Sequence, residues 1–296
     1  MIHVLDLQFE NIRQAIGSFV VETSEGPVLI ESGPHSTYPH LVQALDEKGI
    51  SINDIRHLFL THIHFDHAGA AWALARNGAQ VYVHPFGYKH LARPQKLYES
   101  ARRIYGDDMD RLWGAMESID EEQLSAIEDR QEITVGDTTF RALHTPGHAV
   151  HHIAWQVGDT IFTGDVAGVK IGKGPVVPPC PPPDINIEAW QDSIKTLRSE
   201  NPKTLYLTHF GPVTDINPHL RQLEENLLEW ANWMKPHFEA GTDPKLITPK
   251  FQEFARKQLE AAGVDEAGQE KYEKANPAWM SVAGLLRYWK KREQSA

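Results

Sequence analysis

Short apolar runs alternate with turn-forming residues from residue 4 to residue 208, and this pattern predicts strands interspersed with helices. The predicted strands span residues 4–7, 18–22, 28–30, 57–60, 80–83, 132–135, 139–143, 153–157, 160–163 and 204–208. The predicted helices span residues 38–48, 68–77 and 188–199, and Gly49 stands where a glycine often ends a helix. Strand-rich segments that alternate with helices favour an α/β sandwich.

Beyond residue 215 the pattern becomes wholly helical. Helices are predicted at residues 220–234, 250–262, 265–274 and 277–292, the last with Pro277 in its first turn. We therefore predict a catalytic domain at residues 1–214, with a helix-rich insertion at about 84–130, and a helical C-terminal extension at residues 215–296. The Pro- and Gly-rich stretch 168–183 is too irregular to form an element, and loops of this length are often functional.

Composition narrows the class of protein. The 296 residues are 41% hydrophobic and 23% charged, which is typical of a globular protein with a substantial core. A formal net charge of -11 argues against a nucleic acid or an anionic membrane as partner. The single cysteine, Cys180, excludes an internal disulfide and a cysteine-rich metal site. No apolar run is long enough for a membrane span and no signal-peptide pattern is evident, so we expect a cytoplasmic location.

A dense group of metal-competent side chains follows the predicted strand 57–60. Residues 61–67 read Thr-His-Ile-His-Phe-Asp-His, which places His62, His64, Asp66 and His67 within six positions. Side chains alternate along an extended backbone, so His62, His64 and Asp66 can project to one side. Imidazole nitrogen and carboxylate oxygen are the ligands of catalytic zinc and iron sites. The pattern indicates a metal site rather than surface histidines beside a helix cap.

Three further candidate ligands stand at the ends of later strands. His148 belongs to His-Thr-Pro-Gly-His, Asp165 to Phe-Thr-Gly-Asp, and His209 to Leu-Thr-His-Phe-Gly. The Pro-Gly pair forms a sharp turn that can present one imidazole rigidly. Taken singly, each of the three has a structural alternative, because a strand-end Asp often forms a turn and a lone His often packs.

Together, the HxHxDH, TPGH, FTGD and THFG motifs, in that order, resemble the metallo-β-lactamase superfamily over about residues 15–215. The resemblance implies an αββα sandwich with its site where the two sheets meet. It implies two divalent metal ions, zinc above all, with Fe or Mn as alternatives. The implied ligands of the first metal are His62, His64 and His148, those of the second are Asp66, His67 and His209, and Asp165 bridges the two.

One position departs from the pattern of that family. Glu31-Ser32-Gly33 stands where the family usually has Asp in a strand-end D-x-G. The resemblance implies that this carboxylate orients a metal ligand. Glu is one methylene longer, so whether the expected hydrogen bond forms is left open.

The motif details separate branches of the family. Dedicated β-lactamases usually lack the bridging Asp, nucleases carry a large domain in the interval that here separates Asp165 from His209, and flavodiiron oxidoreductases have Glu in place of His64. The ligand set resembles that of glyoxalase II-like thioesterases and lactonases. We therefore expect a hydrolase whose bridging hydroxide attacks a small ester, thioester or lactone, with Asp66 as a proton shuttle. The alternative is a mononuclear-iron sulfur (persulfide) dioxygenase, and metal identity and number discriminate the two.

The sequence says less about recognition of the expected small-molecule substrate. Aromatic residues of the insertion are candidates to line a pocket, although aromatic residues at helical spacing more often belong to the core; they are Tyr88, Tyr98, Tyr105 and Trp113. The C-terminal helices fit either a cover for the pocket or a homodimer face. Of the adjacent pair His151 and His152, one is a candidate support for the metal ligands, and His152 also suits simple packing.

Overall fold

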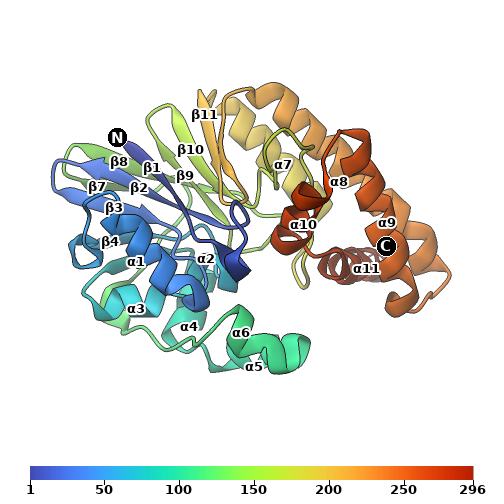
Figure 1. Ribbon diagram of the computed structural model, residues 1–296, viewed down its shortest axis with the longest axis horizontal. Coiled ribbons are helices and arrows are strands. Elements are labelled where there is room, and N and C mark those ends of the chain that lie inside the picture. Colours follow the sequence, from blue (N-terminus) through green and yellow to red (C-terminus); the bar gives the residue numbers. More distant parts are fainter. Residues whose placement is uncertain (296) are drawn as a thin grey trace.

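The computed structural model describes residues 1–295 and contains two six-stranded sheets that face each other (Figure 1). The first sheet has the order β1 (Ile2–Asp6), β2 (Gly17–Thr23), β3 (Gly26–Ile30), β4 (His57–Phe59), β5 (Gln80–Val83) and β6 (Leu124–Ala126). The second has the order β12 (Gly211–Val213), β11 (Thr204–Leu207), β10 (Thr160–Gly164), β9 (Ile153–Val157), β8 (Thr138–His144) and β7 (Glu132–Val135). With helices on both outer faces, this arrangement confirms the predicted αββα sandwich.

Strand direction explains why the candidate ligands can meet. In the first sheet β3, β4 and β5 run parallel, and in the second β10 runs parallel to β11. β8 and β10 are both antiparallel to β9, so they share a direction as well. The motif residues follow the carboxyl ends of β4, β8, β10 and β11. Each sheet therefore delivers its motif loops to one edge.

Large apolar side chains fill the space between the sheets. Phe59 stacks on Phe140 with ring centroids 4.4 Å apart, and Trp155 packs edge-on against Phe59 at 4.8 Å. The indole N–H of Trp155 donates to the Leu60 carbonyl across the interface at 2.9 Å. These three aromatic side chains are almost fully buried, so they fix the two sheets, and hence the loops at their edge, relative to each other.

Helices cover the first sheet. They are α1 (Tyr38–Asp46), α2 (Phe65–Ala68), α3 (Ala71–Arg76), α4 (Pro85–Ala92), α5 (Gln95–Tyr105) and α6 (Met109–Leu112). The prediction of one helix at residues 68–77 is wrong, because α2 and α3 are separate. A β-carbon at Gly69 would lie 2.9 Å from Pro34 Cα, so the break sits where two backbone segments pass closely. The three-residue strands β6 and β12 were not predicted, since so few residues show no periodicity.

A second layer of helices covers the other sheet and extends away from it (Figure 1). It comprises α7 (Ile187–Ser199), α8 (Ile216–Glu239), α9 (Pro244–Ala261), α10 (Glu266–Ala275) and α11 (Ala278–Ser295). One hydrophobic cluster joins the second sheet to all of these helices through residues such as Leu205, Trp190, Leu223, Phe251 and Val282. The predicted domain boundary at residue 214 stays a prediction. None of the helices within residues 1–295 is long and apolar enough to cross a membrane.

Candidate metal centre

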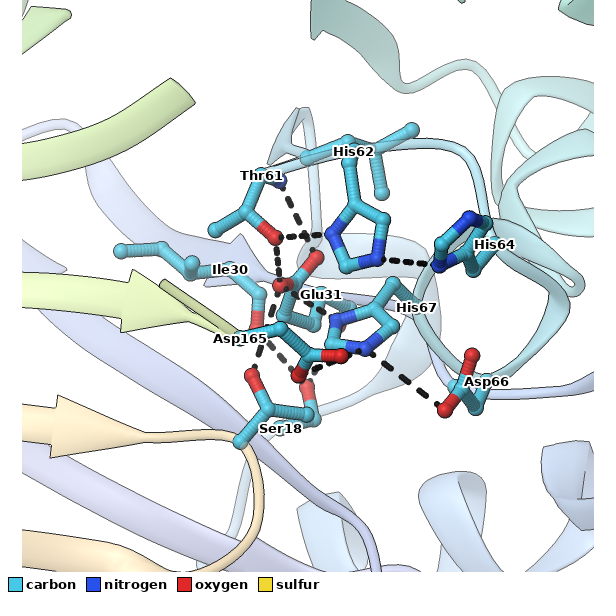
Figure 2. Close-up of polar contacts among 12 residues, drawn as sticks. Ser18, Ile30, Glu31, Thr61, His62, His64, Asp66, His67 and Asp165 are labelled. Carbon is cyan, nitrogen blue, oxygen red and sulfur yellow. Dashed lines mark hydrogen bonds and ion pairs between the residues drawn. The ribbon is translucent and has the colours of Figure 1, made fainter. Parts of the chain in front are cut away.

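All seven candidate ligands converge at the edge where the two sheets meet. Their ligand atoms form two groups, within each of which all of these atoms lie within 4.8 Å of one another, and a third such group combines His62 and His67 with Glu31. The first group contains His62, His64, His148 and Asp165, and the second contains Asp66, His67 and His209. Figure 2 shows the convergence of the residues from the β4 loop with Asp165. The four sequence motifs therefore come together at a single site in the structure.

The first group is built around His64. The Nε2 atoms of His62 and His148 lie 2.9 Å and 3.0 Å from the same Nδ1 of His64. An imidazole nitrogen carries either one proton or one lone pair, so His64 Nδ1 cannot satisfy two such neighbours. Three ring nitrogens directed at one another in this way suit a shared cation instead.

Asp165 lies between the two groups, with one carboxylate oxygen turned to each. Its Oδ2 lies 3.2 Å from His148 Nε2, while its Oδ1 lies 3.3 Å from the Nε2 atoms of both His67 and His209. Asp66 completes the second group, with Oδ2 3.5 Å from His209 Nε2 and 3.7 Å from His67 Nε2. Among the seven candidate ligands, Asp165 is therefore the one whose two carboxylate oxygens face histidines of both groups.

Unsatisfied polar atoms show that divalent cations fit these residues. Within residues 1–295, Nε2 of His67, Nε2 of His209 and Oδ1 of Asp165 are buried and have no hydrogen-bond partner, because their mutual contacts lack hydrogen-bond geometry. A buried polar atom without a partner is costly. These three atoms without partners face one another. Imidazole nitrogen and carboxylate oxygen are ligand atoms that Zn²⁺, Fe and Mn ions bind.

The electrostatics of the metal-free protein also suit cation binding at the first group. Burial lowers the pKa of His62 and His148, and it lowers the pKa of His64 to about 3. Neutral imidazoles with available lone pairs are the form that binds metal. Three donors of the first group are thus ready to bind without losing a proton.

Carboxylates dominate the second group. Burial acts to raise the pKa of Asp66, but the imidazoles of His67 and His209 together outweigh burial and lower this pKa to about 2. Burial likewise opposes ionisation of Asp165, and the imidazoles of His67, His148 and His209 hold its pKa well below the usual range. Burial acts to lower the pKa of His209, yet the Asp165 carboxylate raises it to about 9. Both carboxylates are therefore ionised and able to neutralise part of a cationic charge.

Glu31 resolves the question that its extra methylene raised. Its Oε1 accepts a hydrogen bond from His67 Nδ1 at 2.9 Å and a short one from the Thr61 hydroxyl, and its Oε2 accepts the Thr61 backbone N–H at 3.2 Å (Figure 2). Glu31 is fully buried and has φ of 65°, an unusual value for a non-glycine residue. The longer side chain does reach His67, and the hydrogen bond turns Nε2 of that ring towards Asp66 and Asp165.

Other ligands are oriented by groups that the sequence could not reveal. Nδ1 of His148 contacts the Pro179 carbonyl at 2.9 Å, and Nδ1 of His209 contacts the Ala15 carbonyl at 2.6 Å. A proton on Nδ1 that donates to a carbonyl leaves the Nε2 lone pair for a metal. Backbone carbonyls belong to every residue type, so no motif marks them.

The pair His151 and His152 divides into two roles. His152 Nε2 accepts the backbone N–H of Asp165 at 3.3 Å, and its Nδ1 contacts the Thr145 hydroxyl at 2.9 Å. His152 therefore supports the loop of the bridging residue. His151 lies with its ring centroid 5.9 Å from that of His64, and its buried Nδ1 has no partner within the described residues.

Aromatic residues of the insertion meet the C-terminal helices close to the metal loop. Trp113 lies 6.1 Å from Phe65, the residue between His64 and Asp66, and Tyr105 lies 5.2 Å from Trp113 (centroid distances). Tyr105 also packs edge-on against Trp279 of α11 at 5.7 Å. These contacts show mutual packing, so their role in substrate binding stays a prediction.

Comparison with known proteins agrees with this geometry. The family model described as the metallo-beta-lactamase superfamily matches residues 15–209, the part of the chain that carries all seven candidate ligands. The chain belongs to the metallo-β-lactamase superfamily. The resemblance seen in the motifs is thereby confirmed, and the comparisons support a hydrolase of this superfamily.

Two relatives illustrate the similarity. The metallo-beta-lactamase fold-containing protein ST1585 of Sulfurisphaera tokodaii is 32% identical over 178 residues, which cover 58% of this chain and 67% of that protein. An atrochrysone carboxyl ACP thioesterase of Pseudocercospora fijiensis is 28% identical over 200 residues, covering 66% of this chain and 47% of that protein. The chain thus spans about half the length of this fungal relative.

Solved structures extend the agreement to the whole fold. The crystal structure of the archaeal ST1585 superposes with a TM-score of 0.62 at 27% identity, covering 77% of this chain and 85% of that one. A metallo-β-lactamase family protein of Thermus thermophilus, TTHA1429, gives a TM-score of 0.65 at 16% identity and covers 99% of this chain and 94% of that one. The second likeness shows the fold alone, and it includes the C-terminal helices.

Proposed function

We propose that this protein is a dinuclear metal-dependent hydrolase that cleaves a small ester, thioester or lactone. The placement of Asp165 carries the proposal. Its two carboxylate oxygens lie 3.2–3.3 Å from histidines of two separate donor groups, which suits a bridge between two metal ions better than a ligand of one. A mononuclear site leaves the buried Nε2 atoms of His67 and His209 without a partner.

The ligand roles follow from the two groups. His62, His64 and His148 would hold the first metal, Asp66, His67 and His209 would hold the second, and Asp165 would contact both. When bound, the two divalent ions, zinc above all, supply an acidified water as nucleophile and polarise the substrate carbonyl. Glu31 fixes the His67 ring from a fully buried position.

Asp66 is the residue best placed to move a proton. Its side chain is 20% exposed, whereas the Asp165 side chain is 4% exposed. A carboxylate that lies beside the nucleophile and also reaches the open side of the site can pass a proton to the departing thiolate or alkoxide. We therefore assign proton transfer to Asp66 in addition to its role as a ligand.

Thioesters stand first among the proposed substrates. Several relatives carry thioesterase in their names, including the enzyme of Pseudocercospora fijiensis and the thioesterase pkgB of Emericella nidulans. The ligand set suits this chemistry, since a thioester carbonyl is attacked readily and its thiolate leaving group needs little help. Esters and lactones share the carbonyl and differ in needing a proton at an alkoxide.

A leaving-group series tests the proposal. The zinc-loaded protein is assayed with acyl thioesters of an aryl thiol and of an alkyl thiol, and with a lactone. Asp66→Asn, assayed at saturating zinc, is expected to lose about 10²- to 10⁴-fold in kcat on the lactone, whose alkoxide needs a proton, and less on the thioesters, least of all on the aryl thioester. Absence of hydrolysis with every substrate, together with oxygen consumption by an iron-loaded protein supplied with a persulfide, would replace the proposal with the dioxygenase alternative.

A further inference from the structure

The Pro179 carbonyl, which orients His148, belongs to a segment that has almost no backbone N–H groups with which to form hydrogen bonds of its own. Residues 178–183 read Pro-Pro-Cys-Pro-Pro-Pro, so Cys180 supplies the one backbone N–H of this stretch. No strand ladder can form without N–H donors. The Pro179 carbonyl, 2.9 Å from His148 Nδ1, therefore depends on contacts from elsewhere in the chain.

Two buried side chains supply those contacts on either side of Pro179: Asn276, which directly follows α10, and Ser281 of α11. Asn276 donates from Nδ2 to the Pro178 carbonyl at 3.1 Å, and the Cys180 N–H donates to the Ser281 hydroxyl at 3.4 Å. Ser281 in turn donates to Asn276 Oδ1 at 3.1 Å. Each donor in this set meets an acceptor, and Asn276 is 8% exposed while Ser281 is fully buried. The network thus joins the loop backbone on both sides of Pro179 to Asn276 and Ser281, and a connected set of hydrogen bonds of this kind favours a rigid support.

The C-terminal helices also contact other residues of the Pro- and Gly-rich stretch 168–183. The Tyr272 hydroxyl of α10 accepts the Ile171 N–H at 3.0 Å and donates to the Pro175 carbonyl at 2.7 Å. A β-carbon at Gly284 of α11 would collide with the Cys180 carbonyl, so helix and loop backbones pass in direct contact. Figure 1 shows this loop beside α10, on the side of the molecule where the C-terminal helices lie.

We propose that Asn276 and Ser281 are positioning residues for the metal ligand His148. They fix the Pro179 carbonyl, the carbonyl holds the Nδ1 side of the ring, and Nε2 then points at His64 and Asp165. The C-terminal helices are therefore part of the metal centre rather than only a cover over the sheet. This inference rests on the metal site proposed above.

The test compares zinc affinity in matched variants. Asn276→Ala and Ser281→Ala remove the network, and Gln258→Ala is the control, because Gln258 accepts the Trp230 indole N–H at 2.8 Å in the same helical layer. Zinc affinity is measured by competition with a chromophoric chelator, and the metal-free Tm of each variant is recorded. The two network variants are expected to bind zinc about 10-fold more weakly or worse, and Gln258→Ala to keep wild-type affinity at a comparable Tm.

Each other result has a defined meaning. Wild-type zinc affinity in folded Asn276→Ala and Ser281→Ala overturns the positioning role, and so does an equal loss in Gln258→Ala, which identifies a general stability effect. Failure of the wild-type protein itself to bind zinc overturns the proposed metal site instead. The wild-type protein also allows a test that needs no variant. Zinc loading is expected to slow hydrogen exchange of the Cys180 amide and of α10 and α11, and unchanged exchange there contradicts the coupling.

Discussion

His67 donates a hydrogen bond from ring Nδ1 to the carboxylate Oε1 of Glu31, and the two atoms lie 2.9 Å apart. Both side chains are fully buried, and Thr61 fills two further positions around the carboxylate. The pair fixes which nitrogen of His67 faces the second donor group. Where the family usually has Asp, this chain has Glu31, whose side chain is one methylene longer. Glu31 directly follows β3 and has φ of 65°, so the longer side chain reaches His67 from an unusual backbone conformation.

Shortening or neutralising Glu31 should weaken metal binding. Glu31→Asp withdraws the carboxylate by one methylene, and Glu31→Gln keeps the shape but loses the charge that favours the His67 Nδ1–H. Each is expected to lower zinc affinity by about 10- to 100-fold, as measured by chelator competition. Wild-type affinity in Glu31→Asp would show that the longer side chain is not needed.

Removing the bridging carboxylate should cost both metal and activity. Asp165→Ala is expected to lower zinc content per chain and to abolish hydrolysis, because neither donor group keeps its shared ligand. Asp159→Ala is the matched control, since Asp159 lies just before β10 and pairs with Lys203 on the surface. Elemental analysis measures the zinc content and the thioester assay measures hydrolysis. Full activity in Asp165→Ala refutes the bridging role.

The turn before His148 should tolerate no side chain. Gly147 has φ of 132°, and a β-carbon there would collide with the backbone of Trp190. Gly147→Ala is expected to lower the free energy of unfolding by more than Gly158→Ala and to weaken zinc binding by displacing His148. Gly158 has φ of 58° with open space around it, so its replacement costs roughly 1–2 kcal/mol for backbone conformation alone. Chemical denaturation measures the free energy of unfolding, and chelator competition measures zinc affinity, for each of the two variants. Equal effects of Gly147→Ala and Gly158→Ala would contradict the collision with Trp190 as the cause.

His219 should make folding sensitive to mild acid. Burial lowers the pKa of His219 to about 4, against 6.5 for an unperturbed group, and its Nε2 contacts the Ala167 carbonyl at 2.8 Å. Between these values the unfolded chain binds a proton that the folded protein does not, so stability falls as pH falls from 6.5 towards 4. In the presence of a chelator, the loss of unfolding free energy from pH 7 to pH 5 should be about 2 kcal/mol smaller in His219→Gln. Parallel pH profiles for the two proteins contradict this role.

The motifs predicted the fold and the convergence of the seven side chains because both follow from strand ends. His62, His148, Asp165 and His209 each come after the carboxyl end of a strand, and strands of shared direction deliver such residues to one edge. The chemistry of imidazole and carboxylate then identified the kind of site. Long elements with clear periodicity, such as α7, also appeared close to their predicted bounds.

What the sequence could not show depends on close backbone approach and on carbonyl groups. At Gly69, between α2 and α3, another backbone segment passes so closely that a β-carbon would collide with it, and the supports of His148 and His209 are carbonyls of Pro179 and Ala15. Neither feature has a residue signature. The reach of Glu31 depends on its unusual φ, which side-chain length alone does not reveal. The predicted homodimer face on the C-terminal helices stays a prediction.

The number and identity of the bound metal ions distinguish a dinuclear hydrolase from a mononuclear iron enzyme. The protein is purified without chelator or added metal, and zinc, iron and manganese per chain are determined by elemental analysis. The account predicts roughly two divalent ions per chain, zinc or a zinc and iron mixture, because Asp165 and the two donor groups provide for both. One iron per chain without zinc contradicts the dinuclear hydrolase and favours oxygen chemistry at a single metal.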